Sequence, residues 1–315
     1  MVLAEEVRSG LVETVHDGAV AVVSASGDLI ASFGDIDRPF YFRSIAKPFQ
    51  AAVSQACGAG LEREQLAVAC GSHDGEPVHV ALVEAILTKA GLSPSALRNP
   101  PDWPLAGSAE RRLAASGATE PSRLWNNCSG KHAAMLAAAV ASGWDPAGYL
   151  EPAHPLQNRI TGLMTEVAGP VDPIGVDGCG APVFATTGRL MAGAYARLSS
   201  ATEFLEVFDA MHAFPALVSG VGNVDAAIAT DLDAVGKRGA AGALAVGLRG
   251  RMGLAVKVWD GSGLVAGVAA LAALDQIGEL TPYARDRLAK YSHPPVKGGG
   301  KPVGRIEPRL ELRWQ

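Results

Sequence analysis

A serine and a lysine three residues apart, Ser44 and Lys47, are the sharpest candidates for chemistry in this chain of 315 residues. In a helix this spacing places both side chains on one face, one turn apart. A serine hydroxyl becomes a nucleophile when a base removes its proton, and a lysine kept neutral by burial or by a neighbouring cation is such a base. A serine that caps a helix beside a solvated lysine would give the same spacing, so both interpretations stay open.

The surroundings of this pair favour the catalytic interpretation. The pair follows a predicted strand, Phe40 to Phe42, and is predicted to open an apolar helix that runs to Ala56. Pro48 stiffens the first turn of this helix, where a proline is best tolerated. Serine β-lactamases and penicillin-binding proteins use the same Ser-x-x-Lys pattern.

A second hydroxyl lies in the loop Cys70-Gly-Ser-His-Asp-Gly-Glu, between two predicted helices. Small and polar residues crowd this loop, and Ser72 is a candidate for a second serine in the site. Serine, aspartate and glycine are also the usual residues of a helix-capping loop, so the pattern fits either role.

Cysteines suggest a metal site. Cys128 and His132 lie one helical turn apart, and Cys179 lies between glycines in Asp177-Gly-Cys-Gly-Ala-Pro. Two thiolates from two loops could hold a borderline-soft ion such as zinc. The alternative is a pair of buried free thiols, because the C-x-x-C spacing is lacking. Four cysteines in all are too few and too scattered for a disulfide scaffold.

Lys257 stands inside the apolar run Leu254-Ala-Val-Lys-Val-Trp. Burying a lone lysine is costly without a partner. Either Lys257 faces solvent on an edge strand, or it faces inward as a cation beside the Ser-Lys helix.

The predicted elements place strands at both chain ends and helices between them. Predicted strands cover Gly18 to Ser24, Leu29 to Phe33 and Gly253 to Trp259. Predicted helices cover Glu62 to Ala69, Val78 to Ala90, Ala133 to Ala141, His154 to Val167, Thr187 to Leu198 and Thr202 to His212. An apolar element follows from Leu264 to Leu274, and Pro94 to Pro104 is predicted to be a loop. We expect one catalytic unit over residues 1–315, with a sheet built from both ends and a helical middle lobe.

Composition excludes several classes of function. The net charge is −5 and no basic stripe occurs, which argues against nucleic-acid binding. The longest apolar run, Leu264 to Leu274, is shorter than the about 20 residues that span a bilayer. The first residues lack the apolar segment of a secretory signal. We therefore expect a soluble, cytoplasmic protein that binds neither membranes nor nucleic acid.

Taken together, the motifs resemble the Rhizobium-type, class 3 L-asparaginase family over about residues 10–304. The matching segments are Arg43-Ser-Ile-Ala-Lys-Pro, Ser72-His-Asp-Gly-Glu, Asn126-Asn-Cys-Ser-Gly-Lys-His, His154-Pro-Leu-Gln, Gly175-Val-Asp-Gly-Cys-Gly-Ala-Pro and Gly253-Leu-Ala-Val-Lys-Val-Trp-Asp-Gly.

The resemblance implies an α/β fold like that of serine β-lactamases and glutaminases, with an antiparallel sheet flanked by helices plus a helical lobe. It implies two Ser-Lys pairs, Ser44 with Lys47 and Ser72 with Lys257. It further implies a zinc trio, substrate-binding residues and a homodimer. The zinc trio is Cys128, Lys131 and Cys179. The substrate-binding candidates are Arg43, Asn127 and Asp177, of which Asp177 would receive the substrate α-amino group.

Three departures from the family pattern concern positions outside these sets. Asn99-Pro-Pro-Asp replaces a Cys-Gly-x-His stretch, Ala241 replaces a glutamate, and Lys297 replaces an asparagine.

We expect an L-asparagine amidohydrolase that acts through a serine acyl-enzyme. Backbone N–H groups at the start of the Ser44 helix would stabilise the oxyanion, and zinc would order the pocket rather than activate water. The residues do not tell which serine is acylated, although Ser44 is favoured because it opens a helix. The alternatives are a glutaminase-like or penicillin-recognising enzyme of the same fold, and a non-catalytic amino-acid- or metal-binding protein. Missing S-D-N and K-T-G motifs argue against penicillin recognition.

Overall fold

The computed structural model describes residues 1–315 and divides them into two compact units. The first, called the sheet unit here, consists of Met1–Ile45, Thr186–Thr202 and Val224–Gln315. The second, called the helical unit, consists of Ala46–Ala185 and Glu203–Asn223.

The sheet unit contains a nine-stranded antiparallel sheet with strands from both ends of the chain. Seven strands follow the order β10-β11-β1-β2-β9-β8-β7, while β3 pairs with β2 and β12 pairs with β3. The strands are β1 (Val2–Arg8), β2 (Leu11–Ser24), β3 (Leu29–Phe33), β7 (Ala234–Gly239), β8 (Ala243–Leu248), β9 (Met252–Val258), β10 (Pro295–Gly298), β11 (Lys301–Pro308) and β12 (Arg313–Trp314).

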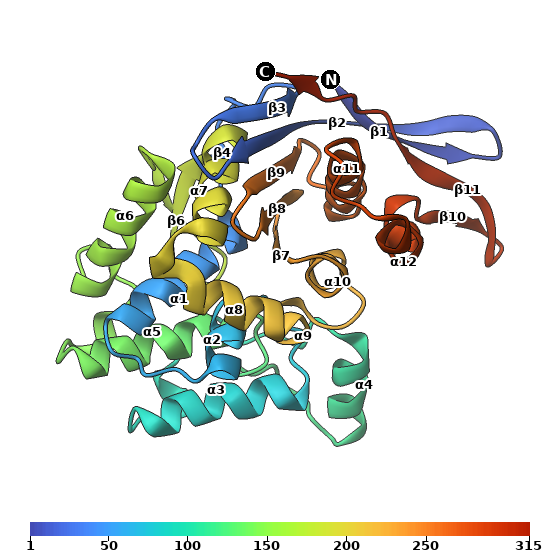
Figure 1. The fold of residues 1–315 in the computed structure, drawn as a ribbon. Coiled ribbons are helices and arrows are strands. Elements are labelled where there is room, and N and C mark those ends of the chain that lie inside the picture. Colours follow the sequence, from blue (N-terminus) through green and yellow to red (C-terminus); the bar gives the residue numbers. More distant parts are fainter. The chain divides into compact units, whose positions relative to one another are not determined.

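Two apolar helices cover opposite faces of the central strands, and Figure 1 shows β8 and β9 between α7 and α11. Val20 and Val256 belong to the same apolar core as the buried residues of α11. The residues before and after them in their strands point to the opposite face, which α7 covers. Gly253 lets α7 approach closely, because a Cβ there would lie 2.0 Å from the Ala192 carbonyl oxygen. The remaining elements of this unit are α7 (Gly188–Ser200), α10 (Val224–Asp231), α11 (Gly263–Gln276), α12 (Pro282–Ser292) and the short strand β4 (Phe40–Tyr41).

The helical unit is organised around α5 (Ser129–Ala141), which packs against α1, α2, α3 and α6. This helix is buried from Ser129 to Ala139, as expected for a helix that is apolar on all sides. The other elements are α1 (Lys47–Ala56), α2 (Arg63–Ala69), α3 (Pro77–Lys89), α4 (Gly107–Ala115), α6 (Pro155–Ala168), β5 (Ile174–Val176), β6 (Pro182–Thr186), α8 (Leu205–Ala213) and α9 (Pro215–Ser219), with 3-10 turns at Pro94–Ala96, Pro146–Gly148 and Thr202–Phe204.

The predicted α/β class with an antiparallel sheet flanked by helices is confirmed. The predicted strands and helices all occur, but β2 begins at Leu11 rather than Gly18, and the last apolar element is the helix α11. No helix combines the length and the apolar character that a membrane crossing needs.

The predicted start of the helix at Ser44 is wrong, and this position belongs to the candidate site. Ser44 does not cap the α-helix: it lies in a 3-10 turn, Arg43–Ala46, and α1 starts at Lys47. Pro48 stands in the first turn of α1, where its missing N–H costs no helical hydrogen bond. The 3-10 turn, which is tighter than an α-helix, therefore ends directly before Lys47.

Candidate active site

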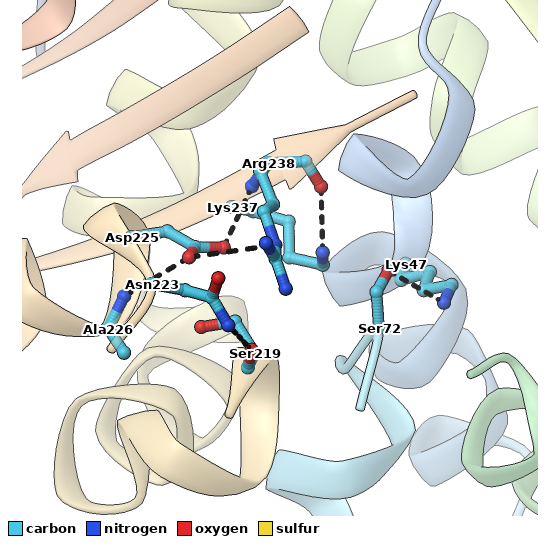
Figure 2. A network of polar contacts seen from close by, with 8 residues as sticks. All are labelled: Lys47, Ser72, Ser219, Asn223, Asp225, Ala226, Lys237 and Arg238. Carbon is cyan, nitrogen blue, oxygen red and sulfur yellow. Dashed lines mark hydrogen bonds and ion pairs between the residues drawn. The ribbon is translucent and has the colours of Figure 1, made fainter. Parts of the chain in front are cut away.

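Lys47 forms a buried polar centre with Ser72 in the helical unit. The Nζ atom of Lys47 lies 3.0 Å from Ser72 Oγ, 2.6 Å from the Gly71 carbonyl oxygen and 3.2 Å from the Asn127 carbonyl oxygen. Figure 2 shows the Lys47 amine turned toward the Ser72 hydroxyl. Lys47 is 1% exposed and Ser72 is 7% exposed, so water hardly reaches the pair.

Three segments hold these atoms in place. Lys47 is the first residue of α1, Ser72 follows the end of α2, and Asn127 precedes α5. The N–H of Ser72 donates to the Val218 carbonyl, which ties the loop after α2 to α9. The hydroxyl is therefore fixed by backbone contacts.

The partners of Lys47 suit an unprotonated amine. Burial is the largest influence and lowers the pKa of Lys47. Cys128 and Cys179 oppose this effect, Lys131 lowers the pKa further, and the net shift is downward. Carbonyl oxygens only accept hydrogen bonds, so a neutral amine would give its two N–H groups to Gly71 and Asn127. The structure records the amine as the donor to Ser72 Oγ; in the neutral amine the lone pair would face Ser72, and the hydroxyl would donate to it. This is the arrangement that a general base requires.

Ser44 lies three residues before Lys47, half-buried in its 3-10 turn. Arg43 precedes it with a φ of 51°, a left-handed conformation that costs a non-glycine residue about 1–2 kcal/mol. Within the sheet unit, the Tyr195 hydroxyl on α7 donates to the Ile45 carbonyl at 3.0 Å. The turn that carries Ser44 therefore begins with a strained residue, and a hydrogen bond from α7 fixes it.

The predicted zinc trio meets at the start of α5. Lys131 Nζ lies 3.0 Å from Cys179 Sγ, and Cys128 and Cys179 share one buried cluster. A hydrogen bond from the Cys128 thiol is the main cause that lowers the pKa of Cys179 far below its ordinary value. The same bond, with burial, raises the pKa of Cys128. Burial alone would lower the pKa of Lys131, but the two sulfur atoms together raise it.

The other predicted binding residues of this unit lie around that cluster. Asp177, half-buried in the turn between β5 and β6, has its Oδ2 4.0 Å from Cys179 Sγ. Asn127 receives a hydrogen bond from the Cys128 thiol at 3.2 Å through its Oδ1. His132, the alternative thiol partner, lies 2.6 Å from the Tyr149 hydroxyl through Nδ1 and also forms a hydrogen bond with Cys179.

Lys257 is buried in the central strand β9 rather than exposed at an edge. Its Nζ donates to the carbonyl oxygens of Val258, at 2.8 Å, and Ala241. The rings of Phe40 and Trp259 lie 5.8 Å and 5.4 Å from it. Burial and then Arg38 lower the pKa of Lys257. This lysine therefore has a full set of partners.

Sequence reasoning missed a second buried lysine of the same sheet, Lys237 on β7. Its Nζ donates to the Arg238 carbonyl at 2.8 Å, and the Asp225 carboxylate receives the Arg238 N–H at 3.0 Å (Figure 2). Cross-strand pairing through β8 places Lys237 and Lys257 on one face of the sheet. Gly239, two residues along β7, packs on Ile45 beside the Ser44 turn. The sequence around Lys237, Ala-Val-Gly-Lys-Arg-Gly, has no continuous apolar run that would have indicated a buried lysine.

The three departures from the family pattern differ in their burial and in their position in the fold. Ala241 lies in the exposed turn between β7 and β8 with a φ of 60°, and its carbonyl binds Lys257. Asn99 is fully buried and donates to the Arg123 carbonyl at 2.8 Å. Lys297 is exposed on the edge strand β10.

Several solved structures are similar to this chain at low identity. Mglu in its tris and glutamate form shares 15% identity with a TM-score of 0.44, over 87% of this chain and 62% of Mglu. A β-lactamase from Mycobacterium bovis shares 18% at 0.42, over 87% of this chain and 95% of that one. A probable glutaminase shares 16% at 0.44, over 81% and 85%. The chain thus spans less than two thirds of the length of Mglu in that form.

A comparison with curated proteins found no match. The family model described as L-asparaginase II matches residues 4–308, which is nearly the whole chain. The chain therefore belongs to the L-asparaginase II family.

Proposed function

We propose that the protein hydrolyses L-asparagine to L-aspartate and ammonia through a serine that Lys47 activates. The observation that carries the proposal is the buried Lys47 amine, which faces Ser72 Oγ while two carbonyl oxygens occupy its other positions. Family membership supports the choice of an amide substrate.

The reaction has two half-reactions. Lys47 takes the serine proton while Oγ attacks the side-chain amide carbon of asparagine. Collapse of the tetrahedral intermediate breaks the C–N bond, and Lys47 returns the proton to the departing ammonia. Water then attacks the aspartyl ester with Lys47 again as the base, which releases aspartate and restores the hydroxyl. Backbone N–H groups in the Ser44 turn are the proposed donors to the oxyanion, and Asp177 the proposed partner of the α-amino group.

The direct test is ammonia release by the purified protein from L-asparagine, with L-glutamine and nitrocefin as comparison substrates. We expect turnover of asparagine and none of nitrocefin. Release from glutamine alone would replace the substrate assignment, and release from no amide would overturn the function.

The donor set at the start of α5 fits zinc if Lys131 takes part. No group of three histidine, cysteine, aspartate or glutamate side chains is placed to hold a metal, so Cys128 and Cys179 need the lysine as their third donor. Two sulfur atoms and one nitrogen suit this borderline-soft ion. The ion would supply a fixed positive centre that orders the pocket around Asp177.

We predict that removing this metal weakens asparagine binding and leaves appreciable kcat. Because Lys131 must lose a proton to bind zinc, affinity should rise with pH and binding should release protons. Cys128→Ser and Cys179→Ser should both lose zinc and raise KM, with Cys57→Ser, outside this cluster, as the control. Elemental analysis and kinetics after chelation check this. Protein that holds no zinc at pH 8 when supplied with it would remove the metal, and a complete, zinc-reversible loss of kcat would make the ion catalytic.

We also propose a homodimer, which the free edge of β2 supports. The earlier part of β2, Leu11 to Asp17, pairs with β1 along one edge, whereas β9 and β3 pair with β2 only from Gly18 onward, so the other edge of this part is free. Leu11 and Val15 there are 71% and 50% exposed. An unpaired edge with apolar side chains suits strand pairing with a second copy. We expect light scattering to give a dimer, and Val15→Lys to give a monomer. A monomeric wild-type protein would overturn this.

A further inference from the structure

The histidine next to Ser72 is completely buried, and its hydrogen bonds define its proton. His73 Nδ1 receives the Gly75 N–H at 3.2 Å, so this nitrogen carries no proton. His73 Nε2 lies 2.9 Å from Ser129 Oγ, and the Ser129 hydroxyl donates to the Leu124 carbonyl at 2.9 Å. The only consistent assignment is a neutral ring with its proton on Nε2, donated to Ser129.

This ring joins the two segments that surround the Lys47 amine. The His73 N–H donates to the Asn127 carbonyl at 3.3 Å, the same oxygen that receives Lys47 Nζ. Through Ser129 the ring reaches the first residue of α5. His73 therefore binds the Asn127–Ser129 segment twice, once through its backbone and once through its side chain.

A second histidine supports the first. The His79 ring stacks on His73 with centroids 5.1 Å apart and planes inclined by 13°. His79 Nδ1 receives the Glu76 N–H, and Nε2 lies 3.3 Å from the carbonyl oxygen of Ala216 in α9. The Nδ1 atoms of both rings accept backbone N–H groups, so neither carries a proton. Burial, with the charges of His79 and Lys47, keeps the pKa of His73 well below its usual value. Burial lowers the pKa of His79 as well, although Asp74 opposes this.

We propose that His73 is a positioning residue: its neutral imidazole, protonated at Nε2, holds Ser72 against Lys47 by tying the Ser72 loop to α5. The inference rests on the proposed function, because it requires Ser72 and Lys47 to take part in the reaction. The bond that matters is the one to Ser129, since the bond to Gly75 stays within the loop.

Two amide replacements separate these bonds. In His73→Asn, Oδ1 can still accept from Gly75, but the link to Ser129 is lost. In His73→Gln, the longer amide can still donate to Ser129. We expect His73→Asn to lower kcat about 10- to 100-fold with little change in KM, the effect of a small displacement of a reacting group. We expect His73→Gln to recover most of kcat.

His154→Asn is the matched control. His154 is also a buried histidine of the helical unit, whose Nδ1 accepts from Leu156 and whose Nε2 lies 3.1 Å from the Asp145 carbonyl oxygen. The two asparagine variants should lose similar thermal stability, but only His73→Asn should lose kcat. Equal effects of both variants on kcat, or an Asn variant as active as the Gln variant, would overturn the proposal.

Three measurements remain decisive if His73→Asn does not fold. Ser129→Ala removes the other end of the bond and should lower kcat to the same degree. Nitrogen-15 spectra of the wild-type protein should show a proton on Nε2 of His73, and a proton on Nδ1 would contradict the inference. The rate at which diisopropyl fluorophosphate labels Ser72 gives a readout without asparagine. Slower labelling in Ser129→Ala of an enzyme that does not hydrolyse asparagine would overturn the proposed function and keep the positioning role.

Discussion

Replacing Lys47 with alanine is expected to lower kcat for asparagine hydrolysis by about 10⁴-fold or more, with the protein still folded. The Lys47 amine lies 3.0 Å from Ser72 Oγ, close enough to take the hydroxyl proton directly. Removing it leaves the hydroxyl without a base. Ammonia release and circular dichroism of the variant check the result.

Charge and basicity can be separated at this position. Lys47→Arg keeps the positive charge but cannot lose its proton near neutral pH, so it should be as inactive as the alanine variant. Lys89→Ala serves as the control, because Lys89 is an exposed lysine that also donates to a carbonyl, that of Gly60. Substantial activity in Lys47→Arg would show that the lysine acts as a cation only.

The pH dependence of activity follows from the role of Lys47 as the base. The reaction needs the neutral amine, and burial lowers the pKa of Lys47 from its ordinary value. Activity should therefore rise with pH through this lowered pKa and reach a plateau above it. A profile that falls over this range would contradict the assignment of Lys47 as the base.

The two serines are distinguished by trapping. We expect Ser44→Ala and Ser72→Ala each to abolish turnover, since one serine carries the acyl group and the other completes the site. Rapid acid quenching during turnover, followed by peptide mass mapping, identifies the acylated residue. The contact with Lys47 favours Ser72, whereas the place of Ser44 at the head of the helical segment favours Ser44. A variant that folds and keeps most of its turnover removes its serine from the mechanism.

The sequence predicted the helical unit better than the sheet. Alanine-rich α5 and the capped helices around it have local signals, such as the glycine stop after Lys89 and the proline start of α6. Strands β7 and β8 lack alternation: β8 is apolar throughout, as buried strands are, and β7 joins an apolar start to Lys237 and Arg238. Those strands therefore escaped prediction, and Lys237 with them.

For the site, the sequence predicted the types of the candidate residues but not which of them contact one another. Residue types and spacing made Lys47, Ser72 and the Cys128 cluster candidates, and the structure places all of them in one unit. Spacing could not indicate that Lys47 contacts Ser72, since 25 residues and the whole of α2 separate them. Only packing of α5 against α1 and α2 brings these segments together. The tautomer of His73 likewise depends on contacts between distant segments.

Lys257→Met is expected to lower kcat by about 100-fold or more and to change stability less. Methionine keeps the length and volume of the stem and removes the buried cation that the second Ser-Lys pair requires. The lost hydrogen bonds to Val258 and Ala241 should cost about 1–3 kcal/mol, because two carbonyl oxygens lose a charged donor. Parallel measurements of kcat and of the melting temperature separate the two effects.

Lys237→Met is the matched variant, because both lysines are buried on one face of the same sheet. Lys257 has two carbonyl partners and lies near two aromatic rings, which is also what a purely structural lysine would have. Lys237 is on the strand that packs beside the Ser44 turn through Gly239. If Lys257→Met loses only stability while Lys237→Met loses kcat, the catalytic cation is Lys237 and Lys257 anchors the β7–β8 turn. If kcat survives in both variants, the site operates with Lys47 as its single lysine base.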